Sequence, residues 1–77
     1  MKELLEVIAR NLVDNPDAVR IVEIEKDRGT TLQLSVAPED MGKVIGKQGR
    51  IARAIRMVMK AAAIHKDVRV TVEIVNT

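Results

Sequence analysis

The spacing of apolar residues changes repeatedly along this chain, and the order of these changes limits the folds open to it. Helical spacing runs from Lys2 to Val13 and ends at the turn before Pro16. Strand-like sequence then follows at Val19 to Lys26 and at Thr30 to Val36, the second with strict alternation. Because only a short turn with Gly29 separates these two segments, we expect an antiparallel hairpin with a positive φ at that glycine.

The first of these two strands departs from simple alternation. Ile21 and Val22 are adjacent apolar residues, although neighbours in a strand point to opposite faces. Either a β-bulge or burial of the strand on both faces would explain the pair. The sequence leaves both explanations open.

The second half of the chain returns to helical spacing before a final strand. Pro38 suits a first helical position, which predicts a short helix from Pro38 to Ile45. A longer helix is predicted from Arg50 to Ile64, and Val68 to Ile74 alternates as a strand. The apolar face expected for the longer helix consists of Ile51, Ala54, Ile55, Val58 and Ala62.

This order predicts an α+β fold with the arrangement αββααβ. The last strand is reached through two helices, and such a crossover places a strand parallel to a neighbour in the sheet. We therefore expect a three-stranded mixed sheet with the helices packed on one face. Seventy-seven residues suffice for one core, so residues 1–77 are expected to form a single domain.

Composition restricts both the core and the chemistry. The chain has no Phe, Tyr, Trp or Cys, so its core must be aliphatic and no disulfide or thiolate site can form. A domain that folds without disulfides fits the cytosol, and neither a cleavable leader nor an apolar run of about 18 residues is visible. We expect a cytoplasmic protein that is not inserted in a membrane.

The stretch most suggestive of function is Gly46-Lys47-Gln48-Gly49, between the two predicted helices. Glycines let a backbone turn tightly and approach another polymer, and a lysine between them can reach a phosphate. A nucleotide-hydrolysing Walker A loop is excluded, because it needs four residues between its glycines and a Ser or Thr after the lysine. A dinucleotide-binding loop is also excluded, because the glycines of this chain do not have the spacing that such a loop needs.

In this context the chain resembles the K-homology (KH) domain, whose signature is an apolar pair, G-x-x-G and then a helix with an early aliphatic residue. The element order resembles the type II form, and the resemblance covers nearly the whole chain. It also resembles the KhpA group of stand-alone bacterial KH domains. The resemblance implies that Gly46, Lys47, Gln48 and Gly49 contact the sugar-phosphate backbone of single-stranded RNA. It further implies an aliphatic groove supported by Val44, Ile45 and Ile51.

The resemblance also implies partners. Members of this group pair with themselves and with a second KH protein of the Jag group, so we expect a homodimer or such a heterodimer. A role in post-transcriptional regulation or as an RNA chaperone follows from the same resemblance. No catalytic residue, cofactor, metal or small-molecule substrate is expected, because the one histidine, His65, stands alone and no carboxylate pair is convincing.

Basic residues gather on and after the glycine-bounded stretch. Lys43, Arg50 and Arg53 lie near Lys47 and are predicted to contact phosphates, whereas Arg56 and Lys60 fit a solvated helix surface. Without aromatic side chains the protein cannot stack bases on rings, so little sequence preference is expected.

Two apolar residues are predicted on the polar side of the long helix. At about 100° per residue, Met57 and Ile64 fall beside Arg53 and Lys60. They are either scattered exposed residues or a contact for a second copy or a partner helix. The second reading supports an alternative function, that of a protein-interaction adaptor which uses the KH fold to dimerise and binds little nucleic acid.

Overall fold

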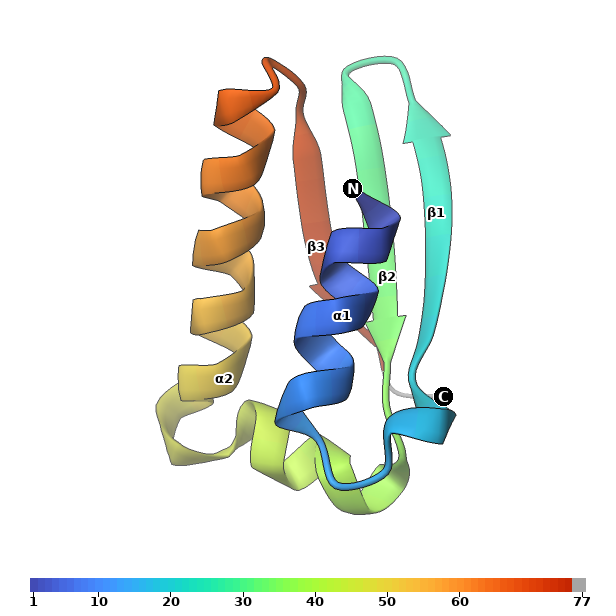
Figure 1. Cartoon of the computed structure of the whole chain (residues 1–77), viewed down its shortest axis with the longest axis vertical. Coiled ribbons are helices and arrows are strands. Elements are labelled where there is room, and N and C mark those ends of the chain that lie inside the picture. The colour runs from blue at the N-terminus through green and yellow to red at the C-terminus, as the bar shows by residue number, and fades with distance from the viewer. Residues whose placement is uncertain (76–77) are drawn as a thin grey trace.

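The computed structural model describes residues 1–75, apart from the side chains of Lys47 and Gln48. Two helices lie on one face of a three-stranded sheet, as expected for the predicted α+β fold (Figure 1). The elements are α1 (Lys2–Leu12), the 3-10 turn η1 (Pro16–Ala18), β1 (Arg20–Lys26), β2 (Gly29–Ser35), α2 (Pro38–His65) and β3 (Val70–Ile74). Within the described residues, neither helix has an apolar run of the length needed to cross a membrane.

The sheet has the order β1-β2-β3 and is mixed, as predicted. β1 and β2 form the expected antiparallel hairpin, and β2 pairs with β3 in parallel. The register from Arg20 opposite Ser35 to Lys26 opposite Gly29 is unbroken, so neither explanation offered for Ile21 and Val22 is correct. Ile21 packs against the core, whereas Val22 lies exposed on the face that no helix covers.

The core between helices and sheet is aliphatic, as the composition requires. α1 contributes Leu5 and Ala9, and the sheet contributes Leu32, Leu34 and Val72. Each fully buried Leu or Val stabilises the fold by about 1.5–3 kcal/mol relative to an exposed position.

The buried face of α2 differs from the predicted one. Its buried residues after the bend are Ala52, Ile55, Met59 and Ala63. Val58 and Ala54, which were predicted to face the core, are exposed instead. The helix carries two apolar stripes, and the one with Ala52, Met59 and Ala63 packs on the sheet.

α2 is a single element in the structure, and it bends where the sequence predicts a loop between two helices. A straight helix of 28 residues would be about 42 Å long, at about 1.5 Å per residue. The longest dimension of the molecule is 34 Å. Gly49 has a φ of +69°, which a right-handed helix does not accommodate. In Figure 1 the first turns of α2 lie below the C-terminal end of α1, and the rest runs back along the sheet beside β3.

Candidate nucleic-acid interface

The bend in α2 encloses a small cleft on the protein surface. Its described lining residues are Gly42, Lys43, Gly46, Arg50 and Ile51, and its volume is about 320 Å³. A Cβ atom placed on Gly46 would meet nothing within 4 Å apart from its chain neighbours and the nearby backbone of its own helix. The backbone at Gly46 is therefore bordered by open space that another chain could enter.

Two glycines of the bend have different structural roles. Gly49 adopts the left-handed conformation that turns α2, and a side chain there would strain the backbone. Gly46 has no such φ, and the space beside it is open. The side chains of Lys47 and Gln48, which the sequence predicts to contact RNA, lie outside the described part of the chain.

The aliphatic residues predicted to support a groove lie at three different depths. Val44 is 1% exposed and belongs to the core, so it can only support the cleft from beneath. Ile51 is partly buried and lines the cleft. Ile45 is 55% exposed and does not line it. The structure thus brings Ile51 to the cleft and leaves the other two outside its wall.

Positive charge dominates this part of the protein. From Lys43 to Lys66 the sequence contains seven lysines and arginines and no aspartate or glutamate. Arg50 and Arg53 are exposed after the bend. The Nζ of Lys43 lies 3.2 Å from Oδ1 of Asp14, an exposed ion pair that is worth about 1 kcal/mol or less. A phosphate could therefore replace Asp14 at little cost.

A buried carboxylate fixes the first turn of α2 against the end of α1. Asp40 is 1% exposed, and its two oxygens accept hydrogen bonds from the backbone N–H groups of Asp14 and Asn15, each at 3.0 Å. Asp40 therefore has a structural role, because it holds the turn that follows α1. Asp40 caps the turn after α1, however, and no side chain caps the N-terminus of α2.

A second feature, which sequence reasoning did not locate, is a groove between α2 and β3. Its volume is about 390 Å³, and its apolar wall includes Met59, Ile64 and Val70. Arg56 stands beside it, and its Nε donates a hydrogen bond of 3.4 Å to the carbonyl of Val72. β3 is an edge strand, so the backbone groups on its outer side have no strand partner within the described sheet. The crossover topology was the one signal that could have located this groove, because it sets β3 beside the long helix.

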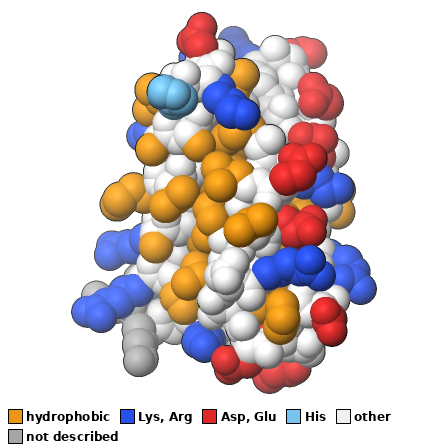
Figure 2. Space-filling view, in the orientation of Figure 1, with side chains coloured by type: hydrophobic (Ala, Val, Ile, Leu, Met, Phe, Trp, Pro, Cys, Tyr) orange, Lys and Arg blue, Asp and Glu red, His pale blue; other side chains and the backbone are white. Residues whose placement is uncertain are grey.

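Met57 and Ile64, the two apolar residues predicted on the polar side of the long helix, are exposed, as their spacing predicts. Met57 is 71% and Ile64 69% exposed, and Val58 is also accessible on the same helix. On α1, Leu4 and Val7 are exposed as well. Figure 2 shows hydrophobic side chains spread over this helical face, with acidic side chains gathered at the edge formed by β1.

Comparison with known proteins agrees with the fold. A family model described as "KhpA/KhpB, KH domain" matches residues 2–74. A protein of Clostridium acetobutylicum named RNA-binding protein KhpA is 61% identical over 75 residues, which cover 97% of this chain and 100% of that protein. Another of that name, from Caldanaerobacter subterraneus subsp. tengcongensis, is 60% identical with the same coverage.

More distant relatives carry the same name. In Aquifex aeolicus, a protein named RNA-binding protein KhpA is 47% identical over 74 residues, which cover 96% of this chain and 94% of that protein. No solved structure matches the chain. The matches confirm the resemblance to a stand-alone type II KH domain, and they show that this chain belongs to the KhpA/KhpB KH-domain family.

Proposed function

We propose that this protein binds single-stranded RNA at the bend of α2. The observation that carries the proposal is the cleft beside Gly46, which is open to solvent and stands at the head of a basic segment without a single carboxylate. An open glycine backbone and a segment rich in positive charge together suit a sugar-phosphate chain. The name of the relatives, RNA-binding protein KhpA, supports the same function.

In this proposal the strand's phosphates lie against the cleft. Lys43 and Arg50 line it, Arg53 follows one turn later, and Lys47 and Gln48 complete the contact from between the two glycines. If three or four phosphates are neutralised, log affinity should fall with log salt at a slope of about −2 to −3 for a single strand.

The bases would lie along the groove between α2 and β3. Its walls are aliphatic, and the free edge of β3 offers backbone donors and acceptors to base edges. Because the protein has no aromatic residue to stack on, base contacts would be weak, and sequence preference should be modest.

We further propose that the protein acts as a dimer in the cytosol, as a post-transcriptional regulator or RNA chaperone. Met57 and Ile64 are the proposed contact, because two large apolar side chains this exposed would gain from burial against a second surface. The second surface would be another copy of this chain or a KH protein of the Jag group, the partners that the family resemblance implies.

The test of RNA binding is a double variant, Lys47→Asp with Gln48→Asp, titrated into a fluorescently labelled oligouridine and followed by anisotropy. We expect affinity to fall by at least about tenfold, or about 1.4 kcal/mol. The matched control is Lys2→Asp with Asn11→Asp, which changes net charge by the same amount on α1 and should bind nearly as tightly as the wild type. Wild-type affinity in the double variant, with an unchanged circular dichroism spectrum, would reject the proposal.

One observation favours an alternative function. The exposure of Met57 and Ile64 suits a protein-interaction adaptor that dimerises and binds little RNA. Crosslinking in cells followed by RNA sequencing separates the two functions. An RNA-binding protein recovers RNA above background, whereas an adaptor recovers only protein partners.

A further inference from the structure

The side chain of Arg56 reaches across the groove between α2 and β3. Its Nε donates a hydrogen bond of 3.4 Å to the carbonyl of Val72, which lies in the middle of β3. Among the described residues, none accepts a hydrogen bond from the two terminal nitrogens of this guanidinium or forms an ion pair with them. Arg56 therefore presents unused N–H donors to a groove in which bases could lie.

The backbone of β3 determines what else a base would meet at this point. Arg69 and Val75, on either side of β3, are hydrogen-bonded through their backbones to β2. Backbone groups of successive residues in a strand point to opposite edges, so those of Val72, an odd number of positions from both, face the free edge of the sheet. The carbonyl of Val72 is engaged by Arg56, and its N–H has no strand partner in the described sheet. What the edge offers here is therefore a donor.

The result is a base position at which only donors are on offer. A bare strand edge presents a carbonyl and an N–H, which suit a base with one donor and one acceptor. At Val72 the carbonyl is occupied, so a base meets the N–H of Val72 and the terminal nitrogens of Arg56. The amines of adenine and cytosine would each face another donor there. Guanine presents two adjacent acceptors, O6 and N7, and a guanidinium can donate to both.

The described wall of the groove holds no acceptor side chain that competes with a base for Arg56. Its lining residues include no aspartate or glutamate, and Lys60, one helical turn beyond Arg56, adds a second positive charge. Met59 and Val70 supply aliphatic surface against which a base can lie. The guanidinium can therefore give its charge-assisted hydrogen bonds to a base.

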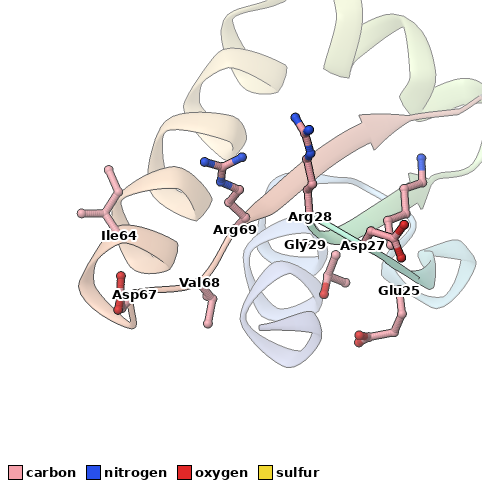
Figure 3. Close-up of a pocket in the computed structure, with 10 residues that line it drawn as sticks. Glu25, Asp27, Arg28, Gly29, Ile64, Asp67, Val68 and Arg69 are labelled. Carbon is pink, nitrogen blue, oxygen red and sulfur yellow. The ribbon is translucent and has the colours of Figure 1, made fainter.

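The wider depression between the β1–β2 turn and the end of α2 does not suit the same role. Its volume is about 910 Å³, and Glu25, Asp27 and Asp67 line it together with Arg28 and Arg69 (Figure 3). Carboxylates on its wall would repel the phosphates of a strand. The bases therefore belong to the groove that Arg56 crosses and not to this depression.

We propose that Arg56 makes this protein prefer guanine at the position of the RNA strand that lies beside Val72. The inference rests on the proposed function and deepens it, because it names one base for the groove that the strand occupies. The preference concerns a single position, so the sequence specificity of the whole strand stays modest.

The experiment measures the affinity of the full chain for labelled oligouridines of about four nucleotides, the length that a KH groove holds. One uridine is replaced by guanosine or by adenosine, at each position in turn, and binding is followed by anisotropy. At one position we expect the wild type to bind the guanosine strand about tenfold more tightly than the adenosine strand. Arg56→Gln should bind the two strands equally. Its circular dichroism spectrum should match the wild type, because a hydrogen bond as long as 3.4 Å contributes little to folding.

Two further variants separate base recognition from charge. The matched control, Lys60→Gln, removes a positive charge from the same groove and should weaken binding to both strands equally, so the guanine preference remains. Arg56→Lys keeps the charge but loses the planar fork, so it should keep the salt dependence of the wild type and lose most of the preference. A full guanine preference in Arg56→Gln or in Arg56→Lys would overturn the inference.

The failure of this inference is distinguishable from the failure of the proposed function. A wild type that binds RNA but favours guanosine over adenosine at no position overturns the inference alone. The Lys47→Asp, Gln48→Asp variant tests the site at the bend separately: if it binds as tightly as the wild type, that site fails, whereas the guanine preference still decides the role of Arg56. A wild type that binds none of these strands would reject both.

Discussion

Substituting Gly46 by alanine should raise the stability of the fold and weaken RNA binding. Its φ is not in the left-handed region, and an added Cβ would meet nothing within 4 Å beyond its chain neighbours and the nearby backbone of its own helix, so the fold has room for a methyl group. Replacing glycine by alanine inside a helix stabilises it by about 0.5–1 kcal/mol. For a domain of this size that raises Tm by about 2–8 °C. The same methyl group would occupy the cleft where we place the sugar-phosphate chain, and RNA affinity should fall about tenfold.

Two measurements check this prediction on the same protein sample. Thermal unfolding followed by circular dichroism gives the change in Tm, and fluorescence anisotropy with a labelled oligouridine gives Kd. Gly49→Ala is the comparison: at a φ of +69° it should lower stability by about 1–2 kcal/mol. If Gly46→Ala binds RNA as tightly as the wild type, the backbone at Gly46 does not face the strand, and the reasoning fails.

Further substitutions test three other parts of the structure. Asp40→Ala leaves two part-buried amides without their charged acceptor and should cost about 3 kcal/mol in urea unfolding, with Asp40→Asn costing less; a loss below about 1 kcal/mol would contradict this role. Asp14→Asn frees Lys43 from its ion pair and should raise RNA affinity by up to about fivefold in anisotropy titrations, whereas a fall would show that the pair positions Lys43 for binding. Met57→Glu with Ile64→Glu should yield a monomer in sedimentation at micromolar concentration, with unfolding free energy changed by less than about 0.5 kcal/mol; an unchanged sedimentation profile would exclude these residues from a dimer contact.

The order of elements could be predicted from sequence because each element has a clear local signal. The alternation of apolar and polar residues predicted β2, Gly29 predicted the turn of the hairpin, and Pro38 predicted the start of α2. The parallel pairing of β3 followed from its crossover connection, which is a rule of topology and not of local sequence.

The sequence does not show which face of α2 is buried, because the helix has two apolar stripes. Periodicity alone favoured the stripe with Ile51 and Val58, whereas the sheet packs against Ala52, Met59 and Ala63. Which stripe is buried depends on how closely helix and sheet approach, and that is a property of the assembled core. The exposure of Val58 is the consequence, and it enlarges the apolar surface around Met57.

The candidate interface was predictable only in part, for a similar reason. The G-x-x-G spacing located the bend, yet local sequence does not show that Ile45 does not line the cleft. The close approach of Gly29 to Arg69 joins residues 40 positions apart in the chain. Such contacts between distant segments have no signature in local sequence.

The most direct test of the central claim is to map the backbone amides that respond to RNA. An oligouridine of about four nucleotides would be titrated into the isotopically labelled protein and followed by amide chemical shifts. We predict the largest changes at Gly46, Gly49 and Ile51 and along the edge of β3, with little change at Val22 and Ile24 on the uncovered face of the sheet. Changes centred on that uncovered face, with the bend of α2 unaffected, would contradict the claim that RNA is held at the bend.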